Sequence, residues 1–259
     1  PTMGGALILV ATLVTTLLKK RGHSVKAVEN GREAVEAIQT GARRFDIVVM
    51  DVQMPEMGGF EATEAIRSSE RSTGQHLPIV ALTAHAMQGD RARCLEAGMD
   101  GYLTKPIDVD ELIATVEGFG GQPSESVVEQ PTHDSAAVIF DERTALACAA
   151  GDRRLLKRII ALFRSDRSTA LRRIGRAVTE EDGEALRMAA HALKGSIATV
   201  GGARGREAAA ELEQMGREHQ FYQAEPAYRR LSKEIALLDD AFAAADLIVG
   251  SQRATGSRR

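Results

Sequence analysis

Three polar residues with complementary chemistry each stand at the end of an apolar run in the first half of the chain. Asp51 ends "FDIVVMD", Thr83 ends "PIVALT", and Lys105 follows "GYLT". A carboxylate can attack a phosphoryl group, an ammonium can neutralise one of its oxygens, and a hydroxyl can bind another. Taken singly, the same residues would be explained by an Asx turn, a strand-end hydroxyl and a solvated lysine. Their succession predicts a small site for phosphoryl transfer.

A second candidate is the histidine in "ALRMAAHALKGSIATVGGA". On a helical wheel at 100° per residue, the apolar stripe comprises Leu186, Ala189, Ala190, Leu193 and Ile197. His191 lies about 140° from the first of these residues, beside Lys194 and Gly195, so we expect an exposed imidazole. Gly195 costs a helix about 1 kcal/mol relative to Ala and clears space beside the ring, while Lys194 could meet the charge of a phosphoryl group. Spacing alone leaves a functional and a structural histidine open.

The elements that must position the first site alternate over residues 1–118. Expected strands are Leu7–Val10, Val25–Val28, Ile47–Met50, Ile79–Leu82 and Gly101–Leu103. Expected helices are Thr12–Lys20, Arg32–Thr40, Glu61–Ser69, Gln88–Ala97 and Val109–Gly118. Continuous apolar runs indicate strands that are covered on both faces. We therefore predict an α/β fold with a doubly wound, five-stranded parallel sheet, in which ligands bind at the carboxyl ends of the strands.

The composition changes after this region. Residues 119–138 mix Gly, Pro, Ser and acids without periodicity, which predicts a flexible linker with an r.m.s. span of roughly 25 Å. Residues 139–245 have helical periodicity, with turn signals at Gly151-Asp152, Glu181-Asp182-Gly183 and Gly201-Gly202. We expect an all-α four-helix bundle there. Residues 246–259 are predicted to form a disordered tail.

Composition excludes several classes of partner. A net charge of −3, spread through the chain, favours neither nucleic acid nor an anionic membrane. The uncharged run Ala6–Leu18 is shorter than the roughly twenty residues of a spanning helix. Its positive charges follow the run, whereas those of a secretory signal precede it. Cys94 and Cys148 fit no metal-ligand spacing and indicate reduced thiols. We expect no membrane contact here and a cytoplasmic location, with any inner-membrane anchor lying elsewhere in a full-length protein.

The motifs "VVMDVQMPEMGG", "ALTAHA" and "GYLTKPI" resemble those of response-regulator receiver domains in residue type, order and separation. The resemblance covers nearly all of residues 1–118. It implies the following roles: Asp51 as phosphoacceptor, Thr83 as switch hydroxyl, Lys105 as phosphate-contacting cation, Tyr102 and Ala84 as switch neighbours, and Asp51 with the Gln53 backbone carbonyl as ligands of Mg²⁺.

The start of the chain departs from that family. Receivers carry two adjacent acidic residues after the first strand to hold Mg²⁺, whereas no acidic residue precedes Glu29 here. A strand ending at Val10 would also run into the next helix at Ala11 without the usual loop of about two to six residues. We expect a break in the chain between these two residues in preference to a deletion, and a weakened or lost magnesium site.

"HALKGSIATVGG" resembles the signature of histidine phosphotransfer (Hpt) domains, which implies that His191 is a phosphoacceptor supported by Lys194 and Gly195. A receiver followed by an Hpt domain resembles the carboxyl-terminal part of hybrid sensor histidine kinases of the ArcB or BarA type. The implied partners are an upstream histidine kinase core, in the same or another polypeptide, and a downstream response regulator. We recognise no ATP-binding core in this sequence.

Two alternatives differ in class from a phosphorelay. The first is a pseudo-receiver that serves as a docking or regulatory module beside a working Hpt domain, which the missing acidic pair motivates. The second is a nucleotide-binding Rossmann enzyme, which the lack of a glycine-rich turn after the first expected strand disfavours.

Overall fold

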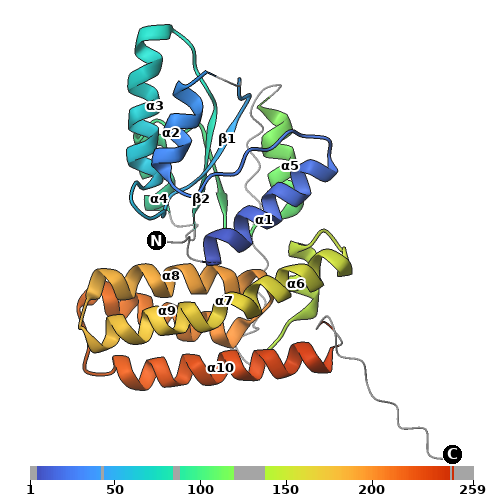
Figure 1. Cartoon of the computed structure of the whole chain (residues 1–259), viewed down its shortest axis with the longest axis vertical. Helices are drawn as coiled ribbons and strands as arrows, with labels where there is room; N and C mark the ends of the chain where they lie inside the picture. Colours follow the sequence, from blue (N-terminus) through green and yellow to red (C-terminus); the bar gives the residue numbers. More distant parts are fainter. Residues whose placement is uncertain (1–4, 42–43, 84–87, 120–137, 246, 248–259) are drawn as a thin grey trace, which may run out of the picture. The chain divides into compact units, whose positions relative to one another are not determined.

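The computed structural model describes residues 5–41, 44–83, 88–119, 138–245 and 247 (Figure 1). The chain divides into two compact units, residues 1–133 and 134–259. The expected linker and tail lie almost entirely outside the described residues; Leu247, within the expected tail, is buried. No helix of the described part is both long enough and apolar enough to cross a membrane.

The first unit is built on three parallel strands, β1 (Val48–Asp51), β2 (Ile79–Thr83) and β3 (Gly101–Thr104), in the order β1-β2-β3. The register pairs Asp51 with Leu82 and Thr83 with Thr104. The helices are α1 (Gly5–Lys20), α2 (Gly31–Gln39), α3 (Gly59–Thr73), α4 (Gln88–Glu96) and α5 (Val109–Gly118). An α/β class with a parallel sheet is therefore confirmed.

Helices cover both faces of this sheet. Because side chains alternate along a strand, Ile79 and Ala81 pack on one face, in a core cluster with residues of α2 and α3 such as Ala34 and Ile66. Helices α1 and α5 lie on the opposite side of the sheet in Figure 1. The central strand β2 is thus buried along its whole length, as the continuous apolar runs predict, whereas β1 and β3 are only partly buried.

The prediction for the amino-terminal stretch is wrong. Leu7–Val10 was expected to be a strand, but α1 runs without interruption from Gly5 to Lys20, so there is no break between Val10 and Ala11. From Leu9 onward, the buried side chains of this helix are Leu9, Val10, Leu13, Val14, Leu17 and Leu18. Their spacing has the helical period, and burial of that stripe outweighs the β-propensity of the individual residues.

The second expected strand, Val25–Val28, is also absent: residues 23–28 have no regular secondary structure. An extended segment becomes a strand only when a neighbour pairs with its backbone, and no described strand lies beside this one. The described sheet therefore has three strands where five were predicted, and both missing strands belong to the first 28 residues.

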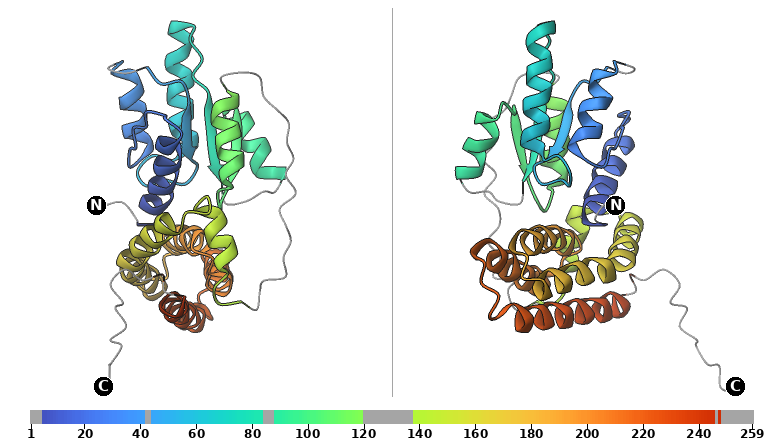
Figure 2. Two further views of the ribbon diagram at one scale, coloured as in Figure 1. Left: turned by 90° about the vertical axis from the view of Figure 1, so that its right-hand side faces the viewer. Right: turned by 60° about the vertical axis from the view of Figure 1, so that its left-hand side comes forward.

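The second unit is helical, as predicted. A short helix, α6 (Glu142–Cys148), precedes four long ones: α7 (Arg153–Thr179), α8 (Gly183–Thr199), α9 (Ala203–Glu218) and α10 (Ala224–Ala244). The left view of Figure 2 looks nearly along these helices, which surround a common core. Phe242 lies in this core and makes edge contacts with Phe140 and Phe163. The four long helices form the expected bundle.

The predicted turn signals begin the helices of the bundle. Asp152 and Asp182 cap α7 and α8, each through a side-chain oxygen that accepts from a backbone N–H of the first turn. Gly201 has a φ of 76°, and a Cβ there would lie 2.4 Å from the carbonyl oxygen of Asp141. The turn into α9 thus requires glycine.

Candidate functional site

The three residues of the first constellation meet at one edge of the sheet. Asp51 is the last residue of β1, Thr83 is the last of β2, and Lys105 directly follows β3. The backbone N–H of Lys105 donates to the carbonyl of Thr83 at 2.7 Å, which ties the lysine to the end of the central strand. Parallel strands end at the same edge, so three separated segments form one site.

Both carboxylate oxygens of Asp51 are engaged. Oδ2 lies 2.5 Å from Nζ of Lys105, and Oδ1 accepts from the backbone N–H of Gln53 at 3.1 Å. Asp51 is 7% exposed, and the Lys105 side chain is 9% exposed. A buried carboxylate is tolerated only when a charge and hydrogen bonds compensate for its lost hydration, and these two contacts supply both.

The loop after β1 is packed closely around the phosphoacceptor candidate. A Cβ on Gly59 would lie 2.4 Å from the carbonyl oxygen of Asp51, so only glycine allows α3 to begin this near the strand. The Gly59 N–H donates to the carbonyl of Val52 at 3.0 Å, and the Gly58 N–H donates to the Glu61 carboxylate at 2.8 Å. The glycine pair of "MPEMGG" therefore holds the strand end in place.

The predicted switch residues are placed in part. Thr83 is buried at 7% exposure, and Tyr102 packs against the core cluster from β3. Ala84 lies outside the described residues. The roles of Thr83 and Tyr102 in a switch remain predictions.

The residues near Asp51 do not fit a magnesium ion. Mg²⁺ demands a near-octahedral set of oxygens and relies on carboxylates to hold it. Asp51 offers one carboxylate, which is ion-paired with Lys105, and Gln53 a backbone carbonyl. The described residues contain no group of three His, Cys, Asp or Glu side chains that could hold a metal, and α1 contains no acid at all.

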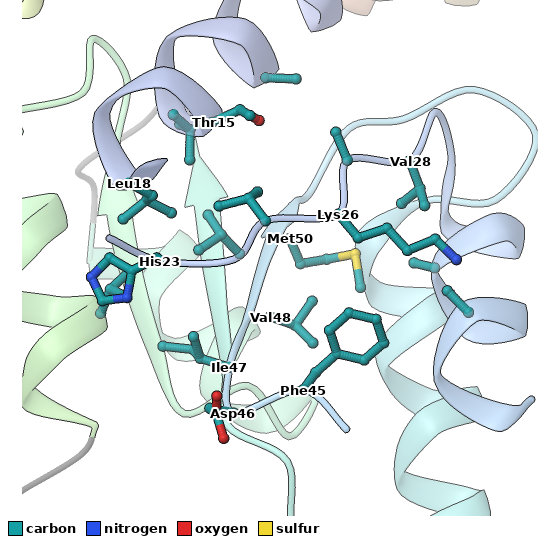
Figure 3. Close-up of a pocket in the computed structure, with 18 of the residues that line it drawn as sticks. Thr15, Leu18, His23, Lys26, Val28, Phe45, Asp46, Ile47, Val48 and Met50 are labelled. Carbon is teal, nitrogen blue, oxygen red and sulfur yellow. The ribbon is translucent and has the colours of Figure 1, made fainter. Parts of the chain in front are cut away.

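A cavity of about 650 Å³ borders β1 (Figure 3). Its walls come mainly from α1, the irregular segment 23–28 and β1, with contributions from α2, α5 and Leu82 of β2, and Asp51 is among the lining residues. Apolar side chains, among them Val14, Val28 and Met50, make up much of the wall.

The second constellation differs from its prediction in one respect. His191 lies on α8, but it is 6% exposed rather than on an open face. Its Nδ1 lies 2.9 Å from Oε1 of Glu213 on α9, and Nζ of Lys194 lies 2.6 Å from Oε2 of the same carboxylate. A wheel places a residue relative to its own helix and says nothing about which neighbour covers it; here α9 does.

Glu213 is 2% exposed and remains ionised. Burial raises the pKa of its carboxyl, but hydrogen bonds from His191 and Lys194 outweigh this and lower the pKa to about 2. An ionised carboxylate only accepts hydrogen bonds, so Nδ1 of His191 must carry the proton that faces it. In the neutral imidazole the nucleophilic lone pair is then on Nε2.

Glycines set the approach of α9 to α8. A Cβ on Gly216 would lie 2.6 Å from the Arg187 nitrogen and 2.7 Å from the Gly183 oxygen, so this end of the helix pair requires glycine. Gly195, by contrast, would place a Cβ in open space, with nothing within 4 Å. Its lack of a side chain is not needed for packing within the bundle, which leaves room beside the site for a group from outside.

Glu213 was not among the residues predicted from the sequence. A signal for it exists: the buried face of α9 otherwise consists of Gly205, Ala208, Ala209, Leu212 and Gly216. A carboxylate in the middle of such a stripe requires a buried cation or donor as partner. Which partner it meets depends on the packing of α9 against α8.

Comparison with known families matches each unit separately. Residues 8–117 match the model of the response regulator receiver domain, and residues 158–243 match that of the Hpt domain. The sensor histidine kinase GacS of Pseudomonas protegens is 40% identical over 196 residues, which cover 73% of this chain and 21% of that protein. Histidine kinase 1 of Arabidopsis thaliana is 41% identical over 135 residues, covering 40% of this chain and 11% of that protein.

Among solved structures, the receiver domain of a sensor histidine kinase from Pseudomonas aeruginosa is 39% identical. The match covers 43% of this chain and 88% of that one, with a TM-score of 0.39. That structure has a magnesium ion coordinated in its active-site cleft. The present chain spans about a fifth or less of the length of the curated relatives named above.

Proposed function

We propose that this chain, which joins a response regulator receiver domain to an Hpt domain, passes a phosphoryl group between Asp51 and His191 in a two-component phosphorelay. The observation that supports this proposal most is that each domain contains a buried pair of a lysine and a carboxylate at its candidate acceptor. In the receiver the carboxylate is the acceptor itself, whereas in the Hpt domain it orients the acceptor histidine.

The first transfer loads the receiver. A carboxylate oxygen of Asp51 attacks the phosphorus of a donor phosphohistidine, a P–O bond forms, and the P–N bond to the donor breaks with its electron pair returning to the donor ring. The ammonium of Lys105, 2.5 Å from the carboxylate, then neutralises charge on the phosphoryl oxygens. No described residue set supports a magnesium ion here, so the lysine is the cation on which this step relies.

The second transfer loads the Hpt domain. The lone pair on Nε2 of His191 attacks the phosphorus, the P–O bond to Asp51 breaks, and its electron pair returns to the carboxylate. The Nδ1 proton stays on the ring, where the ionised Glu213 accepts its hydrogen bond and stabilises the positive charge that the imidazole gains. Glu213 is thus a positioning residue, because it acts through the histidine.

The partners follow from this chemistry. A histidine kinase core must supply the phosphoryl group, whether it precedes the receiver in one polypeptide or is a separate protein. A downstream response regulator must accept it from His191. The linker that the composition of residues 119–138 predicts would raise the effective concentration of one domain near the other to the millimolar range.

The test follows a labelled phosphoryl group from a phosphorylated histidine kinase core to the full chain. We expect label on both acceptors of the wild type, on Asp51 alone in His191→Gln, and on neither in Asp51→Asn. The two are distinguished by treatment with base, which hydrolyses the aspartyl phosphate and leaves the phosphohistidine intact. Label on the histidine of Asp51→Asn at the wild-type rate would contradict the relay.

The pseudo-receiver alternative is favoured by one observation, the poor fit of the Asp51 site to Mg²⁺. It predicts no label on Asp51 from any donor, while a phosphorylated response regulator still labels His191 in reverse. The same assay therefore decides between the two functions.

A further inference from the structure

We propose that the cavity beside β1 is a binding site for an extended, apolar peptide strand of a partner polypeptide, which adds to the open edge of β1. Asp51 borders the cavity, but the proposal does not rest on phosphoryl transfer; it rests on the backbone of β1, the size of the cavity and its lining (Figure 3).

The backbone of β1 presents unused ladder groups to the cavity. The N–H of Val48 donates to the carbonyl of Pro78 at 2.8 Å, and that of Val52 donates to the carbonyl of Leu82 at 3.1 Å. Successive residues of a strand direct these groups to alternate sides. The N–H and C=O of Val49 and the N–H of Asp51 therefore face away from β2, toward an edge that no described strand pairs.

The volume matches a short strand. With a rise of about 3.3 Å, a strand spacing of about 4.8 Å and a layer thickness of about 10 Å, one residue of a strand occupies about 160 Å³. A cavity of about 650 Å³ thus holds about four residues, the length of β1. The cavity therefore has room for an inserted strand of the same length as β1.

The lining selects an apolar peptide. Val10 and Val14 of α1 line the cavity together with Val28, Ile38 and Met50. Such walls complement Val, Ile, Leu or Met side chains on both faces of an inserted strand, each of which would be removed from water. Backbone pairing would supply the affinity and the two apolar walls the specificity.

The charges on the lining add a preference for acidic flanks. Lys26 and Arg44 line the cavity, and no ion pair is found for either among the described residues. Figure 3 shows the ammonium of Lys26 projecting away from the apolar centre of the cavity. Three acids also line the cavity. Asp51 is paired with Lys105, and Glu117 lies 3.6 Å from His23, so Asp46 near the start of β1 is the acid that opposes the two cations. A peptide whose apolar centre is flanked by carboxylates complements the two cations better than a basic one.

The probe is a fluorescein-labelled peptide with the sequence of residues 45–51, FDIVVMD, which has an apolar centre and acidic flanks. We expect saturable binding to the full chain, measured by fluorescence anisotropy, and a rise in the melting temperature of the receiver domain. The matched control is the same peptide with alternate backbone amides N-methylated. It keeps the side chains and loses the ladder donors, so its affinity should fall about tenfold or more.

On the protein side, Val49→Pro removes only an N–H that faces the cavity, so the pairing with β2 is retained while the peptide loses a donor and meets a proline ring. We expect it to abolish binding. Lys26→Glu should lower the affinity for the acidic peptide and raise the affinity for a peptide whose two Asp residues are replaced by Lys. Neither residue takes part in phosphoryl transfer, so labelling of Asp51 can be followed independently.

Three results would overturn the proposal. They are the absence of saturable binding to the wild type, equal affinity of the methylated and unmethylated peptides, and wild-type affinity in Val49→Pro. A concentration-dependent dimer that forms without peptide and disappears in Val49→Pro would instead assign the edge to a second copy of this chain.

Discussion

The receiver and the Hpt domain each hold a buried candidate phosphoacceptor, but the side chains around His191 form a more complete set of partners than those around Asp51. Around His191, Glu213 of α9 meets His191 and Lys194 of the neighbouring helix α8 and, at 3.5 Å, Arg217 of its own helix. Around Asp51, one lysine supplies the charge, and a cavity adjoins the carboxylate.

The difference has a physical origin. A helix satisfies its own backbone, so a bundle needs only side-chain packing to complete a site. A parallel sheet satisfies its backbone through neighbouring strands, so the lack of one strand leaves both an open edge and a missing set of side chains. The sheet site is therefore the more sensitive of the two to the sequence at the start of the chain.

The largest expected effect separates the two acceptors. His191→Gln keeps the size and a hydrogen-bonding group but has no nucleophilic nitrogen, so transfer to a downstream regulator should be abolished while Asp51 is still labelled. The measurement is label on each acceptor after mixing with a phosphorylated donor. The exposed His219→Gln on the same bundle is the control and should behave like the wild type.

A smaller loss is expected when the histidine keeps its ring but loses its orienting carboxylate. Glu213→Gln should lower the rate of transfer to His191 by about tenfold to a hundredfold, because the ring is no longer held in one tautomer and position. Glu211→Gln, on the same helix and paired with Arg230 at 3.0 Å, is the matched control. A single-turnover rate of Glu213→Gln equal to that of this control would contradict the role.

Substitutions of two glycines separate the packing of α9 against α8 from the access of a partner to His191. Gly216→Ala should destabilise the bundle by about 1–3 kcal/mol, because its Cβ would overlap the backbone of α8. Gly195→Ala should be neutral or stabilising by up to about 1 kcal/mol, since its Cβ points into open space and alanine favours a helix. Urea denaturation measures both, and slower transfer in a fully stable Gly195→Ala would show that a partner needs this space.

Acid should weaken the Hpt domain through Glu213. Its folded pKa of about 2 lies below the usual 4.5, since hydrogen bonds from His191 and Lys194 outweigh the effect of burial. The stability that this ionisation contributes is fully present above the unfolded pKa, and it is lost as the pH falls from about 4.5 toward 2. Glu213→Gln should flatten the pH dependence of unfolding in that window; an unchanged profile would contradict the assignment.

The smallest expected effect concerns metal at the receiver. The Asp51 site offers one carboxylate, which is already paired with Lys105. Removing Mg²⁺ with EDTA should therefore leave the melting temperature of the receiver domain unchanged. A Mg²⁺-dependent rise that Asp51→Asn removes would show that the site binds the ion after all. That result would show that a bound ion supplements Lys105 at Asp51, so that the receiver site, like the Hpt site, has more than one charged partner.

Much of the first site follows from local sequence. Asp51, Thr83 and Lys105 each end or follow an apolar run, and ends of parallel strands converge, so their meeting could be predicted without coordinates. The helix starts at Asp152 and Asp182 were predictable because a cap is a contact within four residues.

The sequence alone determines the two fold classes, the order of the domains, the acceptors Asp51 and His191 as candidates, and the absence of acids before Glu29. Only the tertiary structure decides that Leu7–Val10 is helical, that His191 is buried against Glu213, and that an open strand edge borders a cavity. These outcomes depend on which distant surface covers a residue. Burial and pairing between elements far apart in the chain can override local propensity, and no local pattern contains that information.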